Sequence, residues 1–150
     1  MMHKTIINNR KARHDYEILD TYEAGMVLKG TEVKSLREGK ANLTDAYARF
    51  RKGELWLIGM HINPYSMSTV QNHNPLRDRK LLLRRMELKK LYRQVEEKGV
   101  TLIPLKVYFK NHLIKIELAT ARGKKKYDKR AAIAEREMKR DVARHQKNNY

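Results

Sequence analysis

The stretch that decides the predicted fold is TLIPLKVYFKNHLIKIELAT, residues 101–120. In its first half, apolar side chains stand at Leu105, Val107 and Phe109 and alternate with polar ones. In its second half the same two-residue period runs over residues 113–120. Alternation of this kind is typical of strands with one buried face. The stretch therefore predicts a β-hairpin that turns at residues 110–112.

Further strands are predicted on the N-terminal side of this hairpin. Residues 46–51 and 54–62 flank Lys52-Gly53, which is a two-residue hairpin signal. Residues 16–19 and 22–28 are expected to form two more strands, and Gly25 marks either a bulge or a close approach of two backbones.

Two helices and a long loop are predicted between the strands. One helix covers residues 30–39, with Thr31 as its cap, and a second, amphipathic helix follows residues 79–83 and ends at Gly99. Residues 63–79 are expected to be a long loop, and the first eight residues a loose end. About six short strands with two inserted helices predict a small antiparallel β-barrel.

The composition indicates a protein that binds a polyanion. The chain of 150 residues carries a net charge of +17 and contains no cysteine. Such an excess of cations favours nucleic acid over a membrane as the partner. No apolar run approaches a membrane span or a secretory signal, so we expect a single cytoplasmic domain.

The residues that could support catalysis or metal binding do not form a recognisable site. The six histidines are scattered and show no metal-ligand spacing, the serines lack a nucleophile context, and Gly123-Lys124 does not complete a phosphate loop. The early carboxylates, from Asp15 to Glu23, follow basic residues and are expected to pair with them. We therefore expect neither an enzyme nor a bound metal or cofactor.

The segment 123–150 is basic and favours a helix, but it has little to pack against a core. It contains ten basic and four acidic residues, and its apolar stripe is limited to Ala134, Met138 and Val142, with Ile133 alongside. Helices usually need tertiary packing of an apolar face. We expect this tail to be disordered in the free protein and helical on a partner.

Six strings, in order, resemble one known family. They are NRKARH at 9–14, EAG at 23–25, GTEVKSLR at 30–37, GKANL at 39–43, RKLLL at 79–83 and GKKKYDKR at 123–130. Together they resemble the small protein B family, the SsrA-binding proteins of bacterial trans-translation. The chain departs from the family in a shorter basic N-terminal arm and in His145-Gln146, where some relatives carry a bulky apolar pair.

The resemblance implies an oligonucleotide-binding (OB)-type barrel that binds the tRNA-like domain of transfer-messenger RNA (SsrA RNA) and brings it to stalled ribosomes. The protein would replace the anticodon arm of a tRNA, and its tail would occupy the empty mRNA channel. The implied partners are this RNA, the 16S rRNA at the decoding centre and channel, and elongation factor Tu, with the protein as a monomer in a 1:1 complex. The implied division is a flexible N-terminus (1–8), the RNA-binding barrel (9–122) and the basic tail (123–150).

The same resemblance assigns roles by position. The implied RNA-binding residues are Asn9, Lys11, Glu23, Arg79, Lys80, Leu82, Gly123, Lys124 and Lys125. The implied contacts with the decoding centre and mRNA channel are His14, Asp128, Lys129, Arg130, Arg136, Met138, Lys139, Arg140, Val142 and Arg144. Lys11, Arg79 and Lys80 would contact phosphates, and Leu82 would pack on a sugar or an unstacked base, although a core position is an equal alternative for it.

Two other functions stay open on composition alone. A structural ribosomal protein with a basic tail buried in rRNA would have a similar charge. A nucleic-acid enzyme built on a barrel is less favoured, because the sequence offers no acid, base or metal constellation for it.

Overall fold

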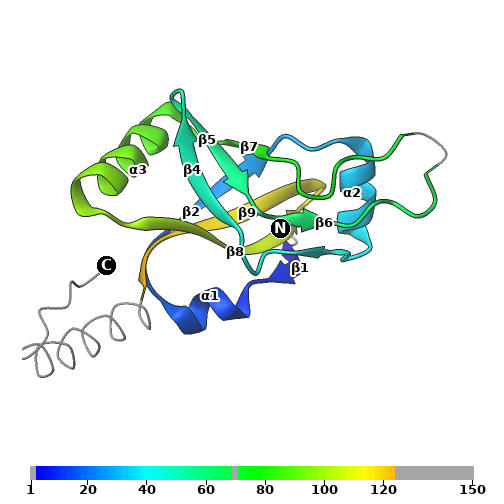
Figure 1. The fold of residues 1–150 in the computed structure, drawn as a ribbon, viewed down its shortest axis with the longest axis horizontal. Helices are drawn as coiled ribbons and strands as arrows, with labels where there is room; N and C mark the ends of the chain where they lie inside the picture. The colour runs from blue at the N-terminus through cyan, green and yellow to red at the C-terminus, as the bar shows by residue number, and fades with distance from the viewer. Residues whose placement is uncertain (1–2, 69–70, 124–150) are drawn as a thin grey trace, which may run out of the picture.

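The structure is a computed structural model that describes residues 3–68 and 71–123. These residues form nine strands and three helices (Figure 1). In chain order the elements are β1 (His3–Asn8), α1 (Arg10–Asp15), β2 (Tyr16–Met26), α2 (Gly30–Arg37), β3 (Ala41–Asn42), β4 (Tyr47–Arg51), β5 (Glu54–Ile58), β6 (His61–Ile62), β7 (Arg79–Leu82), α3 (Arg85–Lys98), β8 (Thr101–Lys110) and β9 (Leu113–Gly123). No helix in the described ranges is long and apolar enough to cross a membrane.

Seven strands form one antiparallel sheet that closes on itself. The order is β1-β8-β4-β5-β7-β2-β9, and β9 also pairs with β8, so the six strands from β8 to β9 make a ring. β1 pairs with β8 beside this ring, and β3 and β6 form a separate two-stranded sheet. The expectation of a mostly antiparallel protein with a few added helices is confirmed.

Both predicted hairpins are present. Lys52 and Gly53 have φ angles of 54° and 78°, as a two-residue primed turn requires, and the twist of that turn matches the twist of its strands. The turn between β8 and β9 also has two residues, one fewer than predicted, and Asn111 adopts a φ of 58° there. Asparagine tolerates this left-handed conformation better than most residues.

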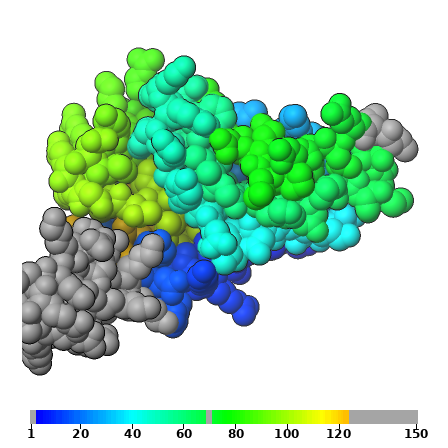
Figure 2. All heavy atoms as spheres, in the orientation of Figure 1, coloured from blue at the N-terminus to red at the C-terminus, as the bar shows by residue number. Residues whose placement is uncertain are grey.

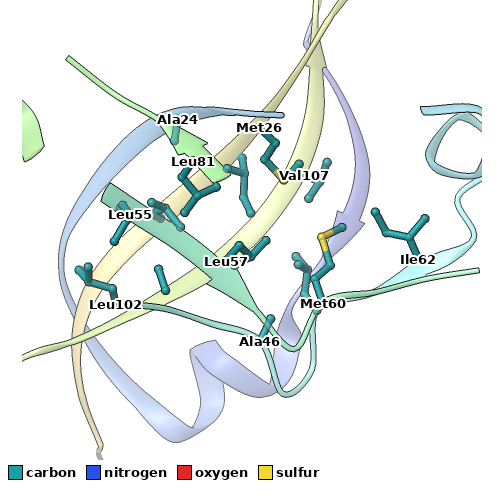
Figure 3. Packing of buried hydrophobic residues seen from close by; sticks show 14 of the residues in the cluster. Ala24, Met26, Ala46, Leu55, Leu57, Met60, Ile62, Leu81, Leu102 and Val107 are labelled. Atoms are coloured by element: carbon teal, nitrogen blue, oxygen red, sulfur yellow. The ribbon is translucent and has the colours of Figure 1, made fainter. Parts of the chain in front are cut away.

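The main hydrophobic core consists of side chains that point into the ring (Figure 3). Leu55 and Leu57 of β5 and Leu81 of β7 are inward positions separated by outward ones. α3 packs against the same core through Leu91, which is buried, and Leu88, which is partly buried. Because a fully buried leucine contributes roughly 1.5–3 kcal/mol, this core is the main source of stability.

A second, smaller core lies beneath α1. It consists of Ala12, Ile103, Leu105, Ala119 and Ala121, and its small alanines allow the helix and the sheet to approach closely. The prediction that Leu105 and Val107 share one face is wrong, because Val107 belongs to the main core and Leu105 to this one. The β8–β9 pairing has a bulge between Pro104 and Lys106. The extra residue shifts the alternation, so that side chains before and after the bulge point to different sides of the sheet.

The N-terminal third differs from the sequence prediction in several ways, among them helix α1, which was not predicted. The expected loose end is strand β1, in which Thr5 pairs with Tyr108 of β8. The expected pair of strands is a single strand, β2, whose register shift lies between Ile18 and Asp20. Gly25 is therefore not at a bulge. A Cβ atom placed on it would lie 3.5 Å from the Cβ of Leu82, an ordinary van der Waals contact, so Gly25 does not mark a close approach of two backbones either.

α2 begins at Gly30, whereas the sequence predicted Thr31 as the residue that caps it. Lys29 is the N-cap, and the Oγ1 atom of Thr31 instead lies 2.8 Å from Nδ1 of His73 in the long loop. Glu32 reinforces the start of the helix by accepting the Lys29 N–H at 2.7 Å. The described parts of the predicted long loop, 63–68 and 71–78, contain neither helix nor strand.

Candidate RNA interface

One outward surface of the ring gathers the predicted RNA-binding residues of the central strands. Leu82 of β7 pairs with Gly25 of β2, and Gly25 pairs on its other side with Lys115 of β9. Glu23 stands two residues before Gly25 and therefore on the same face of β2. We call this surface the Glu23 face and define it by Glu23, Gly25, Leu82, Tyr108, Lys110 and Lys115.

The carboxylate of Glu23 is held by two donors from β8. The hydroxyl of Tyr108 donates to Oε2 at 2.5 Å, and the ammonium of Lys110 donates to Oε1 at 3.1 Å. The Tyr108 hydrogen bond, assisted by Lys110 and Lys115, lowers the pKa of Glu23. Glu23 is therefore an ionised acceptor at neutral pH, and its free lone pairs can receive a base amino group.

Tyr108 is a fixed donor in this arrangement. Burial raises the pKa of its phenol, and the hydrogen bond to the negative Glu23 raises it further. The imidazole of His3 stacks on its ring at 5.6 Å, and Lys106 lies over the ring at 5.4 Å. The tyrosine thus orients Glu23 and fixes its charge.

Leu82 belongs to the surface, which resolves the alternative left open by the sequence. Its side chain is 49% exposed, whereas Leu81 is 2% exposed. Leu82 and Lys115 meet above Gly25: the Cδ1 atom of Leu82 and the Nζ atom of Lys115 lie 3.7 Å and 3.8 Å from where a Cβ of Gly25 would stand. An apolar edge beside a cation suits a sugar or unstacked base next to its phosphate.

Arg79 is not available for a phosphate, so the prediction of that contact is wrong. Its side chain is fully buried, and its Nε atom donates to Oε2 of Glu32 at 2.7 Å. It also donates to the backbone oxygens of Met60 and Pro75. The neighbouring Lys80 does point outward, where its ammonium forms an ion pair with Glu54.

The charges around Glu32 stabilise one another. Burial alone would raise the pKa of the Glu32 carboxyl, but hydrogen bonds from Arg77, Lys29 and Arg79 outweigh that effect and lower it. Burial lowers the pKa of Arg79, and the carboxylate of Glu32 opposes the change. This cluster ties α2 to the end of the long loop and to β7, and its role is structural.

Asn9 has a structural role in this fold, and its predicted RNA contact stays a prediction. It caps α1 by accepting the Ala12 N–H at 3.2 Å. Its amide donates to the carbonyls of Leu43 and Pro104 at 3.2 Å and 2.9 Å. With its side chain buried and all of these partners engaged, Asn9 orients α1.

The remaining predicted residues cluster at α1, away from the Glu23 face. Lys11 and His14 are exposed on this helix, where Lys11 lies 3.6 Å from Asp45. Gly123 pairs with Tyr16, directly after α1, whereas Glu23 pairs with Glu117. Six residues of strand separate the two places, about 20 Å. In Figure 2, α1 lies at the lower edge of the molecule below residues 40–47.

The tail contacts lie outside the described residues. This applies to Lys124, Lys125, Asp128, Lys129, Arg130, Arg136, Met138, Lys139, Arg140, Val142 and Arg144. Their predicted roles stay predictions. Within the described ranges, no group of three or more His, Asp or Glu side chains is placed to hold a metal ion.

A comparison with known proteins identifies the family of this chain. The family model for SmpB protein matches residues 6–148. The chain belongs to the SmpB family.

Two similar proteins are SsrA-binding proteins of other bacteria. That of Desulforudis audaxviator is 60% identical over 94% of this chain and 92% of its own length. That of Acetivibrio thermocellus is 54% identical over 98% of this chain and 96% of its own length. A similar solved structure is described as "tmRNA-SmpB: a journey to the center of the bacterial ribosome". It matches with a TM-score of 0.66 and 55% identity, over 79% of this chain and 83% of that one.

Three members of the Glu23 face were missed by reasoning from the sequence. None of Tyr108, Lys110 and Lys115 was singled out. The alternation of residues 106–118 could have placed Lys115 outward. The contact of Tyr108 and Lys110 with Glu23 joins residues more than 80 positions apart, so no local pattern of this SmpB chain could reveal it.

Proposed function

We propose that this chain binds the tRNA-like domain of transfer-messenger RNA and delivers it to stalled ribosomes for trans-translation. The ring of strands serves as an OB-type barrel over residues 9–122, and segment 123–150 acts as the tail in the empty mRNA channel. The protein works by binding in the cytoplasm, as a monomer in a 1:1 complex, and catalyses no reaction itself. Elongation factor Tu, carrying the same RNA, is a further partner.

The observation that carries this proposal is the Glu23 face. It combines a fixed, ionised acceptor at Glu23, an exposed apolar edge at Leu82 and the cations Lys110 and Lys115. An acceptor, an apolar edge and cations are the parts needed to bind a base, a sugar and a phosphate together. The relatives named SsrA-binding protein and the net charge of +17 support the same partner.

The two surfaces support a division of roles. The Glu23 face would bind the RNA, while His14 on α1, beside the point where the tail begins at Gly123, would face the decoding centre. Lys11 on the same helix keeps its predicted role as a phosphate contact. Protein and RNA would then enter the ribosome as one body in place of a tRNA.

The proposal is tested by the affinity for an isolated tRNA-like domain, measured by fluorescence anisotropy in the presence of excess bulk RNA. We expect wild-type protein to prefer this domain over a simple hairpin. If ~6–10 phosphates are neutralised, the affinity should fall ~10³–10⁵-fold between about 50 and 200 mM salt. Lys115→Glu should weaken binding far more than Lys98→Glu, which makes the same charge change at the far end of α3. Equal binding of the domain and the hairpin would contradict the proposal.

A further inference from the structure

A groove lies where the chain leaves β7 and enters α3. Leu82 belongs to the Glu23 face, and the next residue, Leu83, lines the groove together with residues of the β4–β5 hairpin and of the first turns of α3. The hairpin and α3 are neighbours in Figure 1. The groove is lined by Phe50, Gly53, Leu83, Arg85, Leu88, Lys89 and Tyr92 and has a volume of about 650 Å³. That is ample for one planar base.

The floor of the groove is aromatic and aliphatic. Phe50 packs against the main core, and the ring of Tyr92 meets it edge to face at 5.3 Å. Tyr92 is nevertheless 47% exposed, so part of its ring is open to a ligand. Aromatic rings anchored in this way are the usual platforms for unstacked bases.

The rim of the groove is cationic. Arg85 and Lys89 are one helical turn apart on α3, so they stand on the same side of the helix. Among the described residues that line the groove none is acidic, and neither cation has an ion pair or hydrogen bond within the described chain. By contrast, Arg51 and Lys80 nearby are paired with Asp78 and Glu54.

These features select among possible occupants. The tail of this chain carries net charge +6 over residues 123–150, so the cationic rim would repel it. An RNA strand brings both the planar base that the aromatic floor accepts and the phosphates that match the rim. Leu82 of the Glu23 face and Leu83 of the groove are neighbours in the chain, so the two sites lie at the same end of β7.

We propose that this groove binds one unstacked base of the tRNA-like RNA, with Tyr92 as the stacking surface and Arg85 and Lys89 on the flanking phosphates. The inference rests on the proposed function, because it extends the same RNA beyond the Glu23 face. It adds a base-binding subsite that phosphate attraction alone would not require.

Full-length variants and the isolated tRNA-like domain test this subsite. We expect Tyr92→Leu to weaken binding roughly 5- to 150-fold, the range found for loss of one base–aromatic stack, and Tyr92→Phe to bind nearly as wild type. Lys89→Ala should reduce the slope of log affinity against log salt by about one, whereas Lys98→Ala, on the opposite side of α3, should not. Chemical probing of the bound RNA should show one base protected by wild type and reactive again with Tyr92→Leu.

The outcomes separate this inference from the function on which it rests. Wild-type preference for the tRNA-like domain combined with unchanged affinity of both Tyr92→Leu and Lys89→Ala would overturn the inference alone. The same unchanged affinity with weakened ribosome binding would assign the groove to a ribosomal component and also overturn it. Wild-type protein that bound the domain no better than bulk RNA would overturn both. Lys89 is exposed on the helix, so its variant gives a result even if Tyr92→Leu folds poorly.

Discussion

Among single residues, Glu32 holds the most demanding position, because it is buried between Arg77 and Arg79. Glu32→Gln would leave the guanidinium of Arg79 buried without its counter-charge. We expect a loss of about 3–5 kcal/mol in the free energy of unfolding, measured by urea denaturation. Glu54→Gln is the matched control, since it breaks an exposed pair with Lys80 and should cost no more than about 1 kcal/mol. Similar losses in the two variants would contradict a structural role for the cluster.

The same carboxyl predicts a pH dependence. Its pKa is lower in the folded protein than the ordinary value of 4.5. A lowered pKa stabilises the fold at pH values above the ordinary pKa, and that stability is lost as the pH falls through the folded pKa. We therefore expect the free energy of unfolding to decrease below about pH 4.5, and to decrease less in Glu32→Gln. Parallel pH profiles for the two proteins would argue against this origin.

A further prediction concerns Tyr108, whose hydroxyl donates the hydrogen bond that fixes the carboxylate of Glu23. Tyr108→Phe keeps the ring but removes the hydroxyl that donates to Oε2. Because this hydrogen bond is the largest cause of the lowered pKa, the pKa of Glu23 should rise toward its usual range, as followed by carboxyl-carbon NMR. RNA affinity should fall with it, as Glu23 loses its fixed orientation. An unchanged Glu23 pKa would show that Lys110 and Lys115 set it without Tyr108.

The string RKLLL illustrates how far single residues can be assigned from sequence. Alternation alone implies that residues 79 and 81 share one side and residues 80 and 82 the other, but three consecutive leucines hide which side is inward. An arginine would ordinarily be placed outside. Arg79 is inside because its partner Glu32 comes from α2, 47 positions earlier, and that pairing has no local signature.

At the scale of elements, α1 depends on a single side chain for its position. Asn9→Ala would remove the N-cap acceptor and the amide that donates to the carbonyls of Leu43 and Pro104, although the Leu43 carbonyl would keep the Ala46 N–H. We expect a loss of about 2–4 kcal/mol in the free energy of unfolding. Asn42→Ala is the control, because it removes an exposed hydrogen bond to Thr44 and should cost less than about 1 kcal/mol.

The same variant distinguishes a structural Asn9 from one that binds RNA. Under conditions where Asn9→Ala remains folded, its affinity for the tRNA-like domain should stay within a few-fold of wild type. A large loss of affinity without a loss of stability would confirm the role that the sequence resemblance implied.

Elements with strong local signals were predictable, and their irregularities were not. Lys52-Gly53 and Gly99 mark a turn and a helix end because their backbone conformations demand such residues, and both are confirmed. The bulge at Leu105 and the pairing of β1 with β8 depend instead on contacts between distant strands. The sequence therefore predicted the sheet and its hairpins but assigned Leu105 to the wrong core.

For the whole molecule, the sequence alone already indicated a binder of polyanions, because net charge needs no structure to be counted. It did not show that the implied contacts occupy two places about 20 Å apart along β2 and β9. That separation follows from the register of the sheet. It lets one surface hold RNA while the α1 end, where the described chain stops at Gly123, remains open to a second partner.

This separation predicts how the whole protein responds to loss of its tail. Truncation after Tyr127 removes seven basic and four acidic residues, so the net charge falls only from +17 to +14. If the Glu23 face holds the RNA, affinity for the tRNA-like domain and its salt slope should change little, because the neutralised phosphates remain the same. Tagging of stalled products, assayed in a reconstituted translation system, should be abolished, because the segment proposed for the mRNA channel is gone.

A variant with Lys110 and Lys115 both changed to alanine loses a similar charge and should show the opposite pattern in the binding assay, with weak RNA affinity and a shallower slope. Strong loss of RNA affinity on truncation would instead place the main RNA contacts in the tail and contradict the division of roles between the two surfaces.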